Sequence, residues 1–390
     1  MNVSVLTIGR FHHFDLGRQL LRLGHGLDLF TTNPRAKVDS DLRPYARTHS
    51  RFRIPFAVAT RLGLGRHVYW LDELLLKDFG SWVAENIDAS WSDVFHGLDS
   101  TGPAAGRRIK QAGKLWVCDR GSTHILTQKK LIVEEHRAWR LSPPKFAPER
   151  LERCVAEYEE SHAITVPSHF VKRSFVENGI DGERVFVCPY GVDLSEFRQA
   201  PKQDDVFRVL HVGQINARKG IGYLLEAVEP LARSGRVEVW MAGAINADVQ
   251  PLLDRYRGVF EYKGIWPRNE LWRLYSQASV LVLASIEEGL ALVQAQAMAC
   301  GLPVIATTHT GAEDLFTDGV EGFVVPIRDP QAIRERVEWM MDNREKRDEM
   351  AAAALARVKT LGGWDRYGER VASVYQELAK RHGVKLHDAT

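Results

Sequence analysis

Cysteine is scarce in this sequence. The four cysteines among its 390 residues lie at least 34 positions apart, at Cys118, Cys154, Cys188 and Cys300. No two of them have the Cys-x-x-Cys spacing, which argues against a zinc or dithiol site and against a disulfide framework. We therefore expect a protein of a reducing, cytoplasmic compartment.

Long apolar runs and a dominant charge are also missing. Apolar runs such as residues 280–284 fall far below the roughly 20 residues that span a bilayer. Residues 3–8 have no basic region before them and are too short for a secretion signal, so we expect a first β-strand there. Lys and Arg number 52 against 50 Asp and Glu, a net charge of +2, which disfavours a dedicated nucleic-acid-binding protein.

Short apolar runs alternate with amphipathic stretches along the chain. At about 100–200 residues per domain, the length indicates two domains, and the polar stretch 198–205 has the composition of a linker between them. Strands separated by single helices predict parallel sheets, hence two doubly wound α/β domains that bind ligands at the carboxyl ends of their strands. We expect strands near residues 3–8, 27–31, 93–96, 115–118, 162–166 and 185–188, and again near 207–212, 236–242, 259–263, 280–284, 303–306 and 323–326.

A loop with two cations follows the first expected strand of the second half. The strand ends at Gly213, Arg218 and Lys219 follow, and Gly220 begins a helix. Fixed cations beside a helix N-terminus suit a phosphate or diphosphate, because the backbone N–H groups and the helix dipole add to their charge. The stretch is neither a Walker A loop nor a G-x-G-x-x-G fingerprint, which disfavours those two nucleotide sites. A solvated Arg–Lys pair without a ligand explains the spacing equally well.

A second polar stretch stands between a buried strand and a helix expected at 291–300. Glu288 and Gly289 begin it. Glycine lets a ligand approach the backbone, and a carboxylate accepts hydrogen bonds from sugar hydroxyls. Gln296, about two helical turns after Glu288, is expected to face the same groove. Each feature alone also fits a helix cap and a glutamine facing solvent.

Together, these stretches resemble retaining glycosyltransferase family 4, whose members have the GT-B architecture. The run from Glu288 to Gly301 is similar to the family's Glu-Gly-Phe-Gly-x4-Glu-Ala-Met-Ala-x-Gly motif, and residues 189–197 resemble its interdomain Pro-x-Gly-Val-Asp-x3-Phe segment. The resemblance implies two Rossmann-like domains around a deep cleft. These are an acceptor-binding domain at 1–197, a donor-binding domain at 198–363, and a C-terminal helix at 364–385 that crosses back to the first domain.

The resemblance also implies roles for individual residues. Lys219, with Arg218 beside it, would bind the donor diphosphate, and Glu288 would hold the transferred sugar. Gln214 stands where the family often has arginine, and Gln296 where it has a glutamate that accepts bonds from ribose, which bears on nucleotide affinity more than on catalysis. The implied donor-binding residues are Gly213, Gln214, Gly264, Ile265, Trp266, Gly289, Leu290, Ala291, Leu292, Val293 and Gln296.

The N-terminal half matches the family less fully. Gly9 and Arg10 follow the first expected strand, where the family has a glycine-rich loop near the donor phosphates. Asp119 and His124 follow a later strand, where the family often has a histidine or aspartate near the acceptor. The resemblance thus adds Gly9 and Arg10 to the donor site and Asp119 and His124 to the catalytic residues, although exposed Asp and His also cap loops.

Positive charge is concentrated near the N-terminus. Residues 1–70 contain 11 Lys and Arg against 4 Asp and Glu, and arginines interleave with apolar and aromatic residues through 43–66. This pattern suits an anionic membrane surface or a lipid-diphosphate acceptor. A solvated face with its apolar side in the core explains it as well, and no nucleic-acid module accompanies it.

The resemblance as a whole implies a retaining glycosyltransferase. It would move a sugar from a nucleoside-diphosphate sugar to a hydroxyl of a carbohydrate or lipid-linked acceptor, in surface polysaccharide or glycolipid assembly. We expect no cofactor, and no metal ion either, since no Asp-x-Asp pair stands between the domains and the resemblance implies a metal-independent reaction. Two alternatives stay open, a sugar-nucleotide epimerase of the same architecture and an inactive nucleotide-sugar-binding partner subunit. A nicotinamide dehydrogenase lacks its glycine fingerprint.

Overall fold

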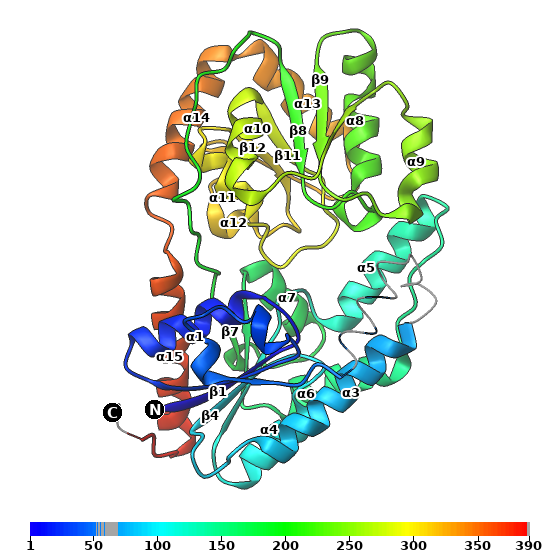
Figure 1. Cartoon of the computed structure of the whole chain (residues 1–390). Helices are drawn as coiled ribbons and strands as arrows, with labels where there is room; N and C mark the ends of the chain where they lie inside the picture. Colours follow the sequence, from blue (N-terminus) through cyan, green and yellow to red (C-terminus); the bar gives the residue numbers. More distant parts are fainter. Residues whose placement is uncertain (52, 54, 56–57, 59–68, 388–390) are drawn as a thin grey trace.

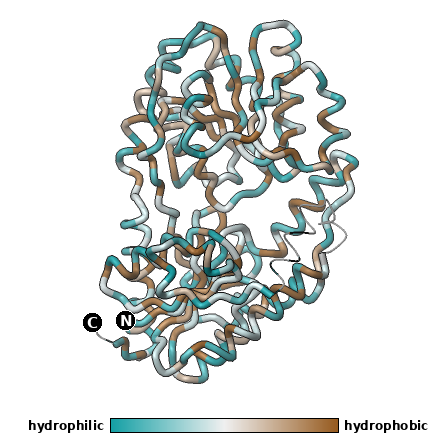
Figure 2. The backbone as a smooth tube through the Cα atoms, in the orientation of Figure 1, coloured by the Kyte–Doolittle hydropathy of each residue, from teal (hydrophilic) through white to brown (hydrophobic). Residues whose placement is uncertain are grey.

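The computed structural model describes residues 1–51, 53, 55, 58 and 69–387. The chain forms two α/β domains, one above the other in Figure 1, each built around its own parallel sheet. This is the predicted pair of doubly wound domains. Apolar residues concentrate along the strands and the inner faces of the helices in both domains (Figure 2).

The N-terminal domain is built on a seven-stranded sheet in the order β3-β2-β1-β4-β5-β6-β7. Its strands are β1 Asn2–Thr7, β2 Gly26–Thr31, β3 Ala46–Thr48, β4 Val94–Leu98, β5 Leu115–Asp119, β6 Ala163–Val166 and β7 Val185–Val187. All five residues of β5 are buried, as expected for a central strand with helices on both faces. The helices are α1 His12–Arg22, α3 Tyr69–Asn86, α4 Pro103–Gln111, α5 Ile125–Ala138, α6 Pro148–Glu160 and α7 His169–Glu177.

The C-terminal domain is built on a six-stranded sheet in the order β10-β9-β8-β11-β12-β13. Its strands are β8 Arg208–Val212, β9 Glu238–Ala242, β10 Glu261–Gly264, β11 Val280–Leu283, β12 Val304–Thr307 and β13 Gly322–Val325. The helices are α8 Ile221–Arg233, α9 Gln250–Arg255, α10 Leu271–Gln277, α11 Val293–Ala299, α12 Ala312–Leu315, α13 Pro330–Asp342 and α14 Arg344–Val358. Because β8 and β11 are neighbours, the loops that follow them lie side by side at the carboxyl edge of the sheet.

The twelve strands expected from the sequence are all present, with ends displaced by at most two residues. The short strand β3 was not predicted. It lies inside the basic stretch 43–66, where only Ala46 of its three residues is buried and Arg47 donates to Asp28 at 2.8 Å. Part of this stretch therefore belongs to the sheet. Arg61 and Arg66, which also contributed to the interpretation as a membrane-binding stretch, lie outside the described residues.

The last helix, α15 Trp364–His382, crosses from the C-terminal domain onto the N-terminal one (Figure 1). Its apolar face packs on α1 and the first sheet, with Tyr367, Val371 and Tyr375 buried in the same core as Val3. The hydroxyl of Tyr375 is also 2.8 Å from Nδ1 of His96 on β4. None of the helices in the described part of the chain has the length and apolar character needed to cross a lipid bilayer.

The two domains also touch across the cleft. Helix α5 reaches the C-terminal domain, where Arg328 donates to Glu135 at 3.1 Å. The hydroxyl of Ser168 donates to the carbonyl of Gly289 at 2.6 Å. Loops at the carboxyl edges of the two sheets are thus hydrogen-bonded to each other. Doubly wound domains bind their ligands at these carboxyl edges.

Candidate functional site

The loop after β8 approaches the end of β11 very closely. A 3-10 turn, Ala217–Lys219, leads to Gly220 at the start of α8. Gly220 has φ 63°, and a Cβ there would lie 1.8 Å from the carbonyl oxygen of Ala284, which follows β11. Only glycine permits both the left-handed backbone and this contact. The loop that carries Arg218 and Lys219, here called the cation loop, is therefore held against the end of β11.

This contact brings the two cations onto Glu288. The ammonium of Lys219 donates to Oε1 of Glu288, and the guanidinium of Arg218 is 3.4 Å from Oε2. The hydroxyl of Ser285 also donates to Oε1, at 3.2 Å. All three predicted residues thus meet at the ends of two neighbouring strands, where the cations can bind phosphate oxygens and the carboxylate can accept from sugar hydroxyls.

Glu287 is a site residue that the sequence analysis missed. Its Oε1 accepts hydrogen bonds from the backbone N–H and the hydroxyl of Thr123, each at 3.0 Å, and from the hydroxyl of Ser122 at 2.5 Å. Burial alone would raise the pKa of Glu287, but the charge of Arg218 and these hydrogen bonds outweigh it and hold the pKa below its usual value. A fixed anion of the C-terminal domain therefore binds the loop after β5. Its only signal in the sequence is its position beside Glu288.

The segment 289–293 is expected to orient the donor through its backbone. A Cβ at Gly289 would lie 2.0 Å from the carbonyl oxygen of Gly121, so this glycine lets the two domains touch. The N–H of Ala291, however, already donates to the carbonyl of Thr310 at 3.0 Å. Helix α11 begins two residues later than expected, and three further predicted residues pack against the core: Leu290, Leu292 and Val293.

The two glutamines that depart from the family pattern hydrogen-bond within their own domain. Oε1 of Gln296 accepts from the hydroxyl of Tyr275 on α10, at 3.2 Å. Oε1 of Gln214 accepts from Asn216 at 3.1 Å. In this structure both amide oxygens are thus engaged by neighbouring side chains.

The remaining predicted donor residues lie on two separate loops. Gly264 ends β10, Ile265 is 74% exposed, and the indole N–H of Trp266 donates to the carbonyl of Lys263 at 2.8 Å. Ile265 is therefore available to a ligand. Next to β1, the carbonyl of Gly9 accepts from Thr7 at 3.1 Å, and Arg10 forms an ion pair of 3.0 Å with Asp39.

His124 is the N-cap residue of α5. Its Nδ1 accepts from the N–H of Leu126 at 3.3 Å, so it caps the helix. The ring is buried beside Tyr158 and Phe175. Burial, with a smaller contribution from the charge of Arg120, lowers the pKa of His124 to about 4. These are the contacts of a neutral helix-capping histidine, and a role in catalysis stays a prediction.

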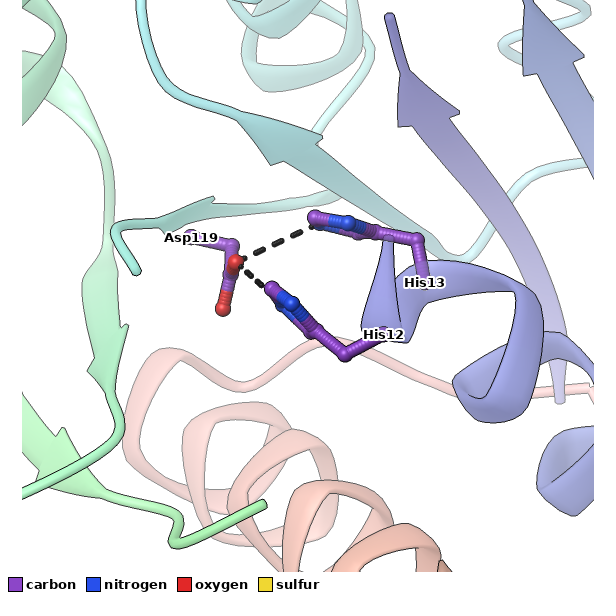
Figure 3. Close-up of side chains that lie close together, drawn as sticks. All are labelled: His12, His13 and Asp119. Carbon is purple, nitrogen blue, oxygen red and sulfur yellow. Dashed lines mark hydrogen bonds and ion pairs between the residues drawn. The ribbon is translucent and has the colours of Figure 1, made fainter. Parts of the chain in front are cut away.

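Asp119, at the end of β5, is surrounded by histidines. Figure 3 shows the rings of His12 and His13 converging on its carboxylate, with Nε2 atoms 2.7 and 3.3 Å from Oδ2. Oδ1 accepts from Thr165 at 2.7 Å and lies 3.6 Å from Nε2 of His96. Burial would raise the pKa of Asp119, but the electrostatic interaction with His12 and the histidine hydrogen bonds hold it well below its usual value. The carboxylate is therefore ionised.

Two imidazoles and a carboxylate are also a donor set for a metal ion. One ligand atom from each of His12, His13 and Asp119 lies within 4.8 Å of the others. However, Oδ2 of Asp119 is 2.7 Å from Nε2 of His12, whereas two ligands of a tetrahedral zinc ion, each about 2.1 Å from it, are about 3.4 Å apart. The spacing is that of a hydrogen bond, and we interpret the group as a hydrogen-bonded cluster.

Two family models match the chain in succession. Glycosyltransferase Family 4 matches residues 11–196, and Glycosyl transferases group 1 matches residues 193–357. A D-inositol 3-phosphate glycosyltransferase of Xylanimonas cellulosilytica is 30% identical over 229 residues, or 53% of this chain and 54% of that protein. WcaL of Salmonella typhimurium, a glycosyltransferase assigned by name to colanic acid biosynthesis, is 28% identical over 172 residues, or 41% of this chain and 42% of that protein. The chain thus matches about half the length of these relatives.

Solved structures share the fold over nearly the whole chain. Sucrose-phosphate synthase from Thermosynechococcus elongatus superposes with a TM-score of 0.71 at 19% identity, covering 98% of this chain and 100% of that one. HepE of Anabaena, solved in complex with UDP and glucose, has a TM-score of 0.68 at 16% identity, covering 97% of this chain and 100% of that one. The two family models together extend over residues 11–357, so the chain belongs to the family 4, group 1 glycosyltransferases and has their GT-B architecture.

Proposed function

We propose that this protein transfers a sugar from a nucleoside-diphosphate sugar to an acceptor hydroxyl, with retention at the anomeric carbon. The observation that supports this most strongly is the convergence of Arg218 and Lys219 on Glu288 at the ends of β8 and β11. A diphosphate requires fixed cations, and a sugar requires a carboxylate that accepts from its hydroxyls. Arg218 and Lys219 provide the cations, and Glu288, which they contact directly, provides the carboxylate.

The charges of this cluster suit the chemistry of a diphosphate leaving group. As the bond between the sugar carbon and the phosphate oxygen breaks, negative charge grows on the diphosphate, and Lys219 and Arg218 stabilise it. An incoming diphosphate competes for Lys219 and so frees Glu288 to accept from the sugar. The interdomain contact between Ser168 and Gly289 helps to exclude water from the reacting centre.

Surface polysaccharide or glycolipid assembly is the setting we propose. The WcaL relative carries the name of such a pathway, and the HepE structure was solved with UDP and glucose. These names concern those proteins, so for this chain the uridine donor and the carbohydrate or lipid-linked acceptor are hypotheses.

The decisive experiment is a donor screen. UDP-, GDP- and ADP-sugars are incubated with the protein, and release of the nucleoside diphosphate is followed together with calorimetric binding of UDP and GDP. We expect saturable binding of one nucleotide and slow hydrolysis of its sugar conjugate without an acceptor. Binding of no nucleotide would overturn the proposal, and binding without turnover in the presence of acceptors would favour an inactive partner subunit.

Product analysis separates the remaining alternatives. A transferase links the sugar to the acceptor, whereas an epimerase of the same architecture releases an altered free sugar regardless of the acceptor. Retention is tested by the anomeric configuration of the product in NMR spectra. Because Lys219 and Arg218 provide the positive charge, we expect full turnover after treatment with EDTA, and its loss would contradict the metal-independent mechanism.

Membrane contact through the basic stretch 43–66 is a further part of this proposal. Tyr45 and Val58 are 40% and 51% exposed, so apolar groups accompany the arginines at the surface. We expect the protein to co-sediment with vesicles containing phosphatidylglycerol, and substitution of Arg51, Arg53 and Arg61 by glutamate to reduce this binding. Equal sedimentation of the two proteins would favour an ordinary solvated face.

A further inference from the structure

The end of helix α5 is embedded in the C-terminal domain, although the helix belongs to the N-terminal one. Figure 1 shows α5 extending from the lower domain toward the upper one. Leu141, which follows the helix, is buried in the same apolar core as Val209 of β8. Nε2 of His136 is 3.1 Å from Oδ2 of Asp248, in the turn after β9. We call residues 135–141 the interdomain clasp.

A buried carboxylate lies within the clasp. The side chain of Glu135 is completely buried, and its Oε1 accepts a hydrogen bond from the indole N–H of Trp139 at 2.7 Å. Its Oε2 accepts from the hydroxyl of Tyr223 at 3.3 Å and from the guanidinium of Arg328 at 3.1 Å, both in the C-terminal domain. Glu135 thus orients Trp139 and joins the clasp to α8 and to the segment after β13.

The clasp also contains an unusual backbone conformation. Three non-glycine residues in the described part of the chain have a left-handed backbone, and two of them, Arg140 with φ 57° and Arg328 with φ 60°, lie at this contact. Arg140 follows the end of α5, where the N–H of Leu141 donates to the carbonyl of His136 at 2.7 Å. Glycine is the usual residue at this position. Left-handed backbones of other residues persist where surrounding contacts hold them, and they are typical of functional sites.

Trp139 lies against the first turn of α8. Its ring contacts Gly222 so closely that a Cβ there would lie 2.2 Å from Cζ2, and it meets the ring of Tyr223 edge-on, with centroids 5.1 Å apart. Glycine weakens a helix compared with alanine, and room for the indole accounts for it here. The first turn of α8 directly follows the cation loop, and α5 also packs against residues 217–219. A side chain of the N-terminal domain therefore supports the cation loop.

Two contacts thus fix the cation loop from different sides. Gly220 holds it against Ala284, within the C-terminal domain. Trp139 holds the first turn of α8 against the N-terminal domain, where the acceptor is expected. The first contact determines the local shape of the proposed phosphate site, and the second determines where that site lies relative to the acceptor. Loss of the second contact should therefore leave nucleotide binding intact and impair transfer.

We propose that Trp139 is a positioning residue for sugar transfer, an inference that rests on the proposed function. Packed on Gly222, it fixes the place of the cation loop relative to the N-terminal domain, so that the anomeric carbon of the donor and the acceptor hydroxyl meet at reacting distance. Trp139 itself exchanges no proton and forms no bond. A displacement of reacting groups by about 1 Å lowers a rate by about 10²-fold, which sets the size of the expected effect.

The test removes the contact from either domain. Trp139→Ala deletes the ring, and Gly222→Ala displaces it while favouring the helical state of α8. Each should lower kcat for transfer by about 10²-fold and keep the affinity of the unchanged protein for UDP or the nucleotide found in the donor screen. Trp139→Phe, which retains a ring over Gly222, should recover most of this loss. The control is Trp70→Ala on α3, where the tryptophan is 51% exposed; this variant should keep full kcat.

Two readouts distinguish positioning from a loss of folding. Hydrolysis of the donor should fall less than transfer, because water needs no positioned acceptor. In a double-mutant cycle, Gly222→Ala should cost nothing further once Trp139→Ala has removed the ring, since both variants break the same contact. The inference is overturned if Trp139→Ala transfers sugar at the unchanged rate, or if Gly222→Ala lowers kcat by the same factor with and without the indole.

The proposed function is tested separately. If the unchanged protein binds no nucleotide and turns over no donor, the glycosyl transfer itself is wrong. Small-angle scattering then still tests the clasp, because without ligand Trp139→Ala should have a larger radius of gyration than the unchanged protein and Trp70→Ala. Equal radii would contradict the clasp. If the unchanged protein is active and Trp139→Ala is equally active, only the role of Trp139 is wrong.

Discussion

The carboxylate of Glu287 accepts a hydrogen bond from the backbone N–H of Thr123, 3.0 Å away, and so joins residues that are 164 positions apart in the chain. Glu287 comes from the loop after β11 in the C-terminal domain, and Thr123 from the loop after β5 in the N-terminal domain. Each has a paired residue of the candidate site nearby: Glu288 is paired with Lys219, and Asp119 is paired with His12. One buried carboxylate therefore connects the two halves of the candidate site.

Replacement of Glu287 by glutamine should loosen this connection. The amide accepts more weakly than a carboxylate and no longer balances Arg218, so we expect a loss of about 1–3 kcal/mol in the free energy of unfolding and a lower kcat. Calorimetric unfolding and small-angle scattering, which reports domain separation, measure the two effects. The control is Glu313→Gln, which removes an exposed interdomain pair with Arg173 of 3.0 Å and should cost at most about 1 kcal/mol. Equal effects of the two variants would contradict this role of Glu287.

Substitutions of Lys219 and Glu288 should affect donor binding and turnover differently. If Lys219 binds the diphosphate as proposed, Lys219→Ala deletes a charged hydrogen bond worth about 1.5–3 kcal/mol, so UDP affinity should fall by about 10- to 100-fold. Glu288→Ala should keep nucleotide binding but abolish transfer, since the carboxylate is assigned to the sugar. Calorimetry and a product assay measure both, with Arg233→Ala, which removes an exposed partner of Glu229 at the other end of α8, as the control. Unchanged nucleotide affinity in Lys219→Ala would remove it from the site.

The sheets could be predicted because their strands are short, buried and apolar, a pattern visible within a few residues. The proximity of Lys219 and Glu288 could be predicted in the same way, because both residues follow strands that are adjacent in a parallel sheet. Strand β3 was not predicted, because only one of its three side chains, Ala46, is buried and the sequence there has no apolar run.

The contacts of Glu287 and His12 could not be predicted from local patterns. Glu287 binds Thr123 across the cleft, and His12 meets Asp119 from 107 positions away. Nothing in the spacing of the histidines specifies which of His12 and His13 is buried, because that depends on how α1 packs beneath α15. The sequence therefore indicates the donor side of the site, whereas the partners of Asp119 emerge only from the fold.

Stability should decrease in acid because histidines are buried without charge. Burial first, and the charge of Lys219 second, lower the pKa of His211 to about 4 from a usual 6.5. Below pH 6.5 His211 is protonated in the unfolded chain but stays neutral in the folded chain until the pH nears 4. The contribution of His211 to the free energy of unfolding is therefore complete above pH 6.5 and is lost as the pH falls toward 4. For His211 the loss amounts to about 3 kcal/mol, and His124 and His162 act in the same direction. Unfolding measured between pH 7 and 4 should show this slope, and His211→Gln should reduce it; equal slopes would contradict the assignment.

Substitutions of the two glycines that flank α8 test whether the close contact between the cation loop and the end of β11 positions Arg218 and Lys219. Both have left-handed backbones, with φ 63° at Gly220 and 71° at Gly235, but a Cβ at Gly235 would meet nothing within 4 Å, whereas one at Gly220 would lie 1.8 Å from the carbonyl of Ala284. Gly235→Ala should therefore cost only the strain of a left-handed residue, about 1–2 kcal/mol. Gly220→Ala should cost at least about twice as much, because backbone must move away from backbone. It should also weaken UDP binding, since Lys219 and Arg218 move with the loop. Equal losses of stability in the two variants, with UDP affinity unchanged in both, would mean that this contact does not position the cations.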